Sequence, residues 1–194
     1  MSDAEKGRSI PSKGNTAVWG SVGDLLGVAR FDAGDLGWLE LGWTAKGLAR
    51  LHFSPDDSSF PHGVSEEPLP APIADALGRY LERDPHAFDG LALDLEGTDF
   101  QRRVWAALQR VPFGHVRSYG GIAIDVDSPR AMRAVGMANG QNPVAIVVPC
   151  HRIVEAKGRL GGYTGGVEHK VALLRHEGVR VEGDRVRPGQ LTLF

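Results

Sequence analysis

The first half of the chain alternates short apolar runs with breaks rich in Gly and Asp. Apolar and aromatic residues fill 25–31, 36–43 and 48–53, and Ala-Gly-Asp and Ala-Lys-Gly turns separate these runs. Short runs of this composition between turn residues are typical of antiparallel strands. We therefore predict a three-stranded meander, followed by a loop over 54–70, where Pro, Ser and acidic residues are frequent.

The pattern then changes to helical spacing. Apolar side chains recur at intervals of three and four residues and predict a helix over 71–83. A short strand over 91–95 should complete this part of the chain. We expect a domain boundary shortly before Gly97.

The second half opens with a helix start signal. Thr98 is followed three residues later by Gln101, the spacing of a capping box. The apolar stripe behind it predicts a helix that ends before Pro112. Two short helices follow, over 118–127 and 129–139, the second with Pro129 in its first turn. Two short helices joined by a tight turn predict a helix-turn-helix.

An apolar run between two prolines, 144–148, predicts a buried strand that ends at Pro149 and Cys150. The last helix should cover 167–177 and stop at Gly178, because glycine commonly ends helices.

These elements predict an α+β protein. Its small N-terminal antiparallel sheet-plus-helix domain should span 15–92. A mostly helical, winged-helix-like domain with the helix-turn-helix should span 97–178. We expect residues 1–14 to be disordered and 179–194 to form a C-terminal tail.

Charge is distributed unevenly along the chain. The net charge is −2, but residues 1–99 hold 8 basic and 17 acidic side chains, a net −9, whereas residues 100–194 hold 14 basic and 7 acidic, a net +7. One interpretation is two solvated faces of unlike sign. The other, which we favour, is that the second half faces a polyanion and binds it through phosphates.

Cysteine usage and hydropathy limit the other possibilities. A single cysteine excludes a disulfide framework and a multi-cysteine zinc site, and it suits a reducing, cytoplasmic location. No apolar stretch approaches the roughly 20 residues of a membrane span, and residues 1–14 lack the apolar core of a secretory signal. We expect a monomer without membrane contact.

The candidate chemistry is concentrated in Pro149-Cys150-His151-Arg152. Cysteine is a strong nucleophile only as a thiolate, and His151 and Arg152 offer a proton acceptor and a positive field. A buried, inert cysteine beside a surface histidine is the ordinary alternative. The dipeptide alone does not decide between them.

Eight ordered blocks of residues surround this motif. They are Gly97-Thr98-x-Phe100-Gln101-x-x-Val104-Trp105, Pro112-Phe113-Gly114, Ser118-Tyr119-Gly120, Arg133-Ala134-Val135-Gly136, Asn142-Pro143, Pro149-Cys150-His151-Arg152, Tyr163-x-Gly165-Gly166, and Lys170 with Leu173-Leu174-x-x-Glu177-Gly178. Residues 97–178 thereby resemble the DNA-binding, active-site domain of the O6-alkylguanine-DNA alkyltransferase family. The acidic first half is loosely similar to that family's small N-terminal domain.

The resemblance implies DNA repair by direct reversal, in which the alkyl group of O6-alkylguanine moves irreversibly to Cys150. O4-alkylthymine is an additional candidate substrate. The resemblance implies that His151 takes the thiol proton through a water, that Glu177 holds His151, and that Tyr119 donates a proton at guanine N3. No cofactor or metal is implied, and each molecule should react once.

Residues for DNA and the base pocket follow from the same resemblance. Arg133 matches the arginine that fills the space left by the everted nucleotide, and Ala134 lies beside it on the second helix of the motif. The substrate partner is double-stranded DNA that carries the alkylated guanine. The implied pocket residues are Met137, Asn142, Ile153, Tyr163 and Thr164.

Two rival functions and one terminal motif remain open. A lesion sensor without chemistry would not need Cys150, and a thiol hydrolase using Cys150, His151 and Glu177 would turn over repeatedly. The end of the chain, Gln190-Leu191-Thr192-Leu193-Phe194, is similar to peptides that dock bacterial repair proteins on the sliding clamp. The same residues could equally fold back as a final strand.

Overall fold

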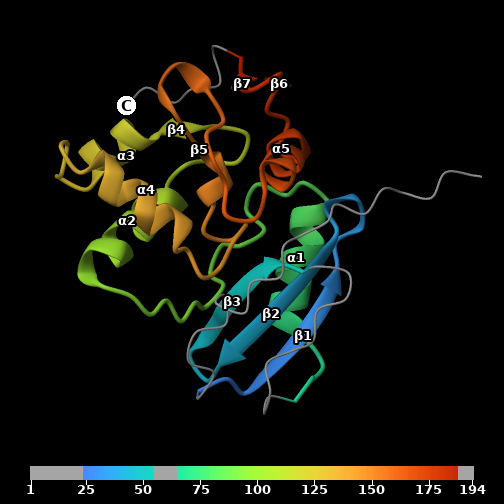
Figure 1. The fold of residues 1–194 in the computed structure, drawn as a ribbon. Coiled ribbons are helices and arrows are strands. Elements are labelled where there is room, and N and C mark those ends of the chain that lie inside the picture. The colour runs from blue at the N-terminus through green and yellow to red at the C-terminus, as the bar shows by residue number, and fades with distance from the viewer. Residues whose placement is uncertain (1–23, 55–64, 188–194) are drawn as a thin grey trace, which may run out of the picture.

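The computed structural model describes residues 24–54 and 65–187 (Figure 1). The expectations for residues 1–14, for most of the loop over 54–70 and for the terminal motif at 190–194 lie outside the described residues. Within the described ranges, no helix is long and apolar enough to cross a membrane.

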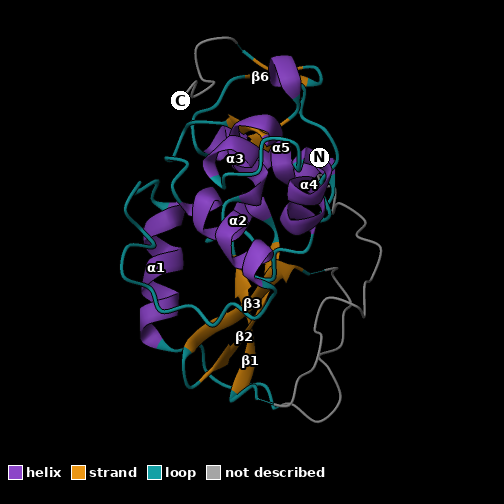
Figure 2. Cartoon of the chain, turned by 90° about the vertical axis from the view of Figure 1, so that its left-hand side faces the viewer, coloured by secondary structure: helices purple, strands orange, loops and turns teal. Residues whose placement is uncertain are grey.

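The first half forms the predicted antiparallel meander. Its elements are β1 (Gly27–Asp32), the 3-10 turn η2 (Gly34–Leu36), β2 (Trp38–Thr44), β3 (Gly47–Phe53) and α1 (Ala71–Leu81). Pairing of Leu39 with Phe53 and of Leu41 with Leu51 places their buried side chains on one face, because side chains alternate along strands. Helix α1 lies along the sheet in all three views and joins the same apolar cluster (Figure 2).

The expected strand over 91–95 is wrong. Only Leu93 forms a bridge, to Leu48 of β3. The chain touches the edge of the sheet there and then leaves it.

The second half is mostly helical, as predicted, and its described elements are α2 (Asp99–Gln109), β4 (Arg117–Ser118), α3 (Tyr119–Asp125), α4 (Met132–Gly140), η3 (Cys150–Arg152), β5 (Ile153–Val154), η4 (Ala156–Gly158), α5 (Val167–His176), β6 (Val181–Glu182) and β7 (Arg185–Val186). The capping box is confirmed. Thr98 Oγ1 accepts from the Gln101 amide at 3.3 Å, and Gln101 Oε1 accepts from the Thr98 amide at 2.7 Å.

Helices α2, α3 and α4 pack against one another and contain the predicted helix-turn-helix. Helix α4 begins at Met132, three residues later than expected. The Ala131 amide donates to the Ser128 carbonyl at 2.8 Å, so Pro129 and Arg130 lie in a turn that reverses the chain before the helix.

The predicted strand over 144–148 is also wrong. Among these residues only Val144 forms a β-bridge, to Leu51. The Val148 amide donates to the Val144 carbonyl at 3.0 Å, so the chain reverses within the run. Ile146 adopts φ = 70°, a left-handed conformation that is costly for a β-branched residue. The run is apolar because it is buried, and its backbone is a series of turns.

The segment after Gly178 is packed rather than a free tail up to residue 187. Gly178 ends α5 at φ = 80°, as predicted, and β6 and β7 then form a hairpin. Val179 and Val186 are buried with Val154 and Leu174 in a second apolar cluster. The domain limits near 92 and 97 stay a prediction, since the main apolar cluster contains residues from both halves of the chain.

Candidate active site

Cys150 begins the 3-10 turn η3 directly after Pro149. Only 5% of the residue is exposed, and its Sγ lies 3.6 Å from the Tyr163 hydroxyl. The preceding segment is braced by Asn142, whose Nδ2 donates to the Val148 carbonyl at 2.7 Å and whose Oδ1 accepts from the Val144 amide at 3.0 Å. The thiol is therefore held at the end of a fixed loop, not at the end of a strand.

The environment of the thiol differs from the one inferred from the sequence. Burial raises the pKa of Cys150, and hydrogen bonding by Asn142 and Tyr163 and the charge of Lys170 only partly oppose it. Arg152 does not contribute the expected positive field, because its guanidinium binds Glu177. No hydrogen bond joins Sγ to the His151 ring among the described residues. A thiol in this setting stays protonated until a base takes its proton.

The imidazole of His151 is sealed inside the protein and points at Glu177. The His151 Nε2 to Glu177 Oε1 distance is 2.8 Å, and both side chains are fully buried. Burial lowers the pKa of His151, although Glu177 opposes the shift. The ring is thus neutral near pH 7, and because it donates through Nε2 to a carboxylate, its Nδ1 carries the lone pair. Within the described residues, no protein group hydrogen-bonds to Nδ1.

Glu177 accepts five hydrogen bonds from the described residues. In addition to His151, Arg152 donates through Nε at 2.8 Å and Nη2 at 2.9 Å, the Gly114 amide at 3.3 Å and the Tyr80 hydroxyl at 3.0 Å. Burial by itself raises the pKa of Glu177, but His151 and Arg152 hold it well below its usual range. The carboxylate is therefore ionised, as the assigned role requires.

Tyr119, Arg133 and Ala134 belong to α3 and α4, the two helices of the predicted helix-turn-helix. Tyr119 begins α3 and is half-buried against Gly136 of α4. Burial and the nearby Cys150 raise its pKa, so the phenol keeps its proton. Arg133 and Ala134 are exposed on α4, and within the described chain the Arg133 side chain makes no ion pair or hydrogen bond.

The five predicted pocket residues lie in different settings. Tyr163 faces the thiol and Asn142 braces its loop, as described above. Ile153 is buried, and its carbonyl already accepts from Lys170. Thr164 is exposed and donates to the Gly140 carbonyl at 3.1 Å, whereas Met137 is 68% exposed on α4.

Comparison with known proteins decides the family. A profile described as the 6-O-methylguanine DNA methyltransferase DNA-binding domain matches residues 99–179. A methylated-DNA--protein-cysteine methyltransferase of Mycobacterium tuberculosis is 47% identical over 146 residues, which are 75% of this chain and 78% of that protein. The chain belongs to the methylated-DNA--protein-cysteine methyltransferase family. The resemblance inferred from the sequence blocks is confirmed.

Solved structures agree with this family and with the predicted α+β class. A crystal structure of Mycobacterium tuberculosis OGT in complex with DNA has a TM-score of 0.68 at 40% identity, covering 78% of this chain and 92% of that one. The O6-methylguanine-DNA methyltransferase of Pyrococcus kodakaraensis has a TM-score of 0.61 at 28% identity, covering 78% and 99%.

Lys170 received no role from its sequence pattern, but the structure places it close to Cys150 in the candidate active site. Its side chain is completely buried, and Nζ donates to the carbonyls of Ile153 at 2.6 Å and Leu160 at 2.5 Å. Burial lowers the pKa of Lys170 to about 8, while Cys150 opposes the shift. The sequence did indicate that Lys170 is buried, because its spacing places it on the same face of α5 as the apolar Leu173 and Leu174.

We predict that Glu177 sets part of the acid stability of the protein. Because its folded-state pKa lies below the ordinary value of 4.5, its contribution is fully present above that pH and is lost as pH falls below it. Glu177→Gln should reduce the free energy of unfolding by about 3–5 kcal/mol at pH 7, since it leaves Arg152 buried without a counter-charge. It should also flatten the stability profile below pH 4.5.

Urea unfolding between pH 3 and 7 measures both effects. Glu168→Gln, at an exposed position of the same helix, serves as the control and should keep the wild-type slope. An equally steep acid limb in Glu177→Gln would contradict the assignment.

Proposed function

We propose that this protein repairs DNA by moving the alkyl group of O6-alkylguanine to its own Cys150 in one irreversible step. The observation that carries the proposal is a lone buried cysteine followed by a histidine that is held by an ionised, buried glutamate. Membership of the methylated-DNA--protein-cysteine methyltransferase family supports the same reaction.

Proton removal from the thiol is the task of His151. Its Nε2 donates to Glu177, so the Nδ1 lone pair is available as the base. A bridging water carries the proton from Sγ, since the thiol and the ring share no direct hydrogen bond in the described structure. The resulting imidazolium is stabilised by Glu177, which offsets the burial that keeps the ring neutral at rest.

Transfer then proceeds by displacement at carbon. The sulfur–carbon bond forms as the carbon–O6 bond breaks, and the electron pair of that bond stays on guanine. Tyr119 donates its phenolic proton at ring nitrogen N3 and neutralises the departing base. A thioether on Cys150 cannot be hydrolysed by these groups, so the reaction is stoichiometric and uses no cofactor.

Access to the base requires the nucleotide to leave the duplex, because the O6 alkyl group is enclosed by the base stack. Helix α4 presents Arg133 and Ala134 to DNA, and Arg133 fills the space that the everted nucleotide leaves. The pocket is then lined by Tyr163 and Met137, with backbone groups of Ile153 and Thr164 hydrogen-bonding guanine.

O4-alkylthymine is a second candidate substrate. We propose a cytoplasmic monomer.

The modification itself is the first prediction of this proposal. After incubation with an oligonucleotide that carries O6-methylguanine, intact mass should rise by about 14 Da, one methyl group per chain. Peptide mapping should place the methyl on Cys150, and Cys150→Ala should remain unmodified. A wild-type protein that stays unmodified refutes the proposal, and repeated turnover would instead favour a thiol hydrolase.

Arg133 should matter for duplex DNA and not for the chemistry. Arg133→Ala is expected to slow methyl transfer from duplex by about tenfold or more, because the extrahelical nucleotide loses its substitute in the stack. Reaction with free O6-benzylguanine should change less than twofold. Arg130→Ala, in the turn before α4, is the matched control for loss of positive charge. Equal losses on both substrates would remove the proposed role.

We further propose that Gln190, Leu191, Leu193 and Phe194 bind the bacterial sliding clamp. The support is sequence alone, since these residues lie outside the described structure. Deletion of 190–194 should abolish binding to purified clamp while methyl transfer stays unchanged. A variant with the same five residues in scrambled order controls for chain length, and unchanged clamp binding after deletion rules the idea out.

A further inference from the structure

Tyr80 links the N-terminal half of the chain to the proposed catalytic network. It lies near the end of α1, is 1% exposed, and donates its hydroxyl to Glu177 Oε1 at 3.0 Å, although 97 residues separate the two. The same oxygen accepts from His151 Nε2 at 2.8 Å. Burial and the neighbouring Glu177 raise the pKa of Tyr80 well above its usual value, so the hydroxyl remains a donor.

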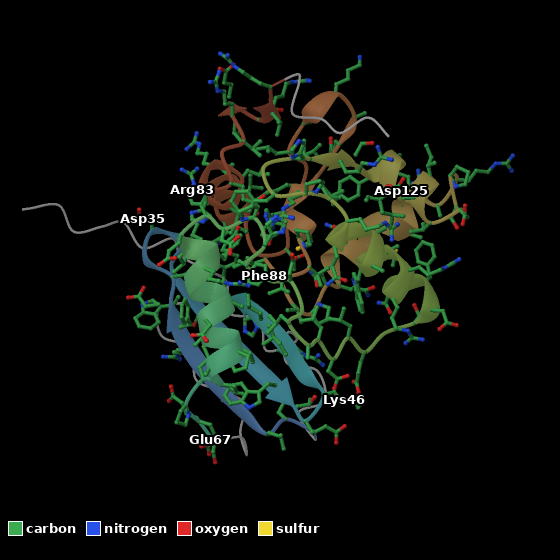
Figure 3. The ribbon with its side chains drawn as sticks, turned by 180° about the vertical axis from the view of Figure 1, so that it is seen from behind. Asp35, Lys46, Glu67, Arg83, Phe88 and Asp125 are labelled. Atoms are coloured by element: carbon green, nitrogen blue, oxygen red, sulfur yellow. The ribbon has the colours of Figure 1, made fainter. Side chains whose placement is uncertain are left out.

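The Tyr80 ring is fixed independently of its hydroxyl. It stacks on Phe88 with ring centroids 5.2 Å apart and meets the edge of Phe113 at 6.0 Å. Its carbonyl accepts from His176 Nε2 at 2.8 Å. Figure 3 shows Phe88 between the two halves of the molecule, beside the end of α1. The ring and backbone of Tyr80 are therefore fixed by contacts that do not involve its hydroxyl, and the hydroxyl is held at Glu177.

Arg83 adds another contact between the same two segments, and this contact, like the one between His176 and the Tyr80 carbonyl, does not involve the carboxylate. Arg83, which follows α1, donates through Nε to the His176 carbonyl at 2.7 Å (Figure 3). This contact holds the end of α5 by its backbone. The Tyr80 hydroxyl thus links the two segments through the Glu177 side chain, whereas the Arg83 contact links them without it. Variants of these two residues can therefore separate orientation of the carboxylate from simple docking.

We infer that Tyr80 is a positioning residue for alkyl transfer, acting through Glu177 to orient His151. A carboxylate can rotate about its terminal bond, and a buried base must keep its geometry within narrow limits to be effective. Arg152 and Gly114 fix Oε2, and the Tyr80 hydroxyl with Arg152 fixes the oxygen that His151 uses. The N-terminal half thereby completes a site whose reacting residues all come from the C-terminal half.

The inference rests on the proposed function and is tested on the full-length chain. Tyr80→Phe keeps the ring and removes the hydroxyl. It should lower the single-turnover rate constant at saturating methylated duplex by about tenfold, with DNA affinity unchanged. Arg83→Gln should lower the melting temperature but leave that rate constant within twofold. Equal rates for Tyr80→Phe and wild type, or equal losses in both variants, would overturn the positioning role.

A double-mutant cycle with Glu177→Gln shows whether Tyr80 acts through this carboxylate. In the Glu177→Gln background, removing the Tyr80 hydroxyl should lower the rate constant less than twofold further. A second, full tenfold loss would mean that Tyr80 acts by another route. Failure of the proposed function is distinguishable, because wild-type protein would then show no methyl on Cys150 at all.

Discussion

The site depends on the hydrogen bonds and ion pair made by the buried carboxylate of Glu177. It is the counter-charge of Arg152, the acceptor for His151 and the partner of Tyr80 and of the Gly114 amide. A charge removed from water is tolerated only when it is paired and hydrogen-bonded. Because the donors come from α1, the loop after α2, and η3, this requirement brings distant parts of the chain together around one side chain at the end of α5.

Burial of the site also explains why the Cys150 thiol is protonated before the reaction. Burial raises the pKa of Cys150 and lowers that of His151, so both groups are neutral at rest. In the proposed mechanism the thiol ionises only during the reaction, when a substrate is in place and Glu177 stabilises the developing imidazolium. A preformed thiolate would need a positive field, and Arg152, to which the sequence pattern assigned that field, binds Glu177 instead.

Local patterns in the sequence predicted most elements, and long-range contacts explain the differences. The sheet, α1 and the capping box at Thr98 follow from alternation, helical spacing and a three-residue motif. Residues 144–148 did not form a strand, because apolar content reports burial and not backbone conformation. The residues that carry the resemblance included Cys150, His151 and Glu177. The link to Tyr80, 97 residues away, leaves no local signature, and neither does the coupling of Arg152 to Glu177.

In the proposed mechanism His151 is a neutral base whose Nε2 proton is held by Glu177 and whose Nδ1 accepts the thiol proton. Nitrogen-15 chemical shifts of the His151 ring between pH 7 and 8 distinguish the two neutral tautomers from the imidazolium. We expect a neutral imidazole protonated at Nε2 throughout this range. A ring protonated at Nδ1, or an imidazolium at pH 7, would contradict it.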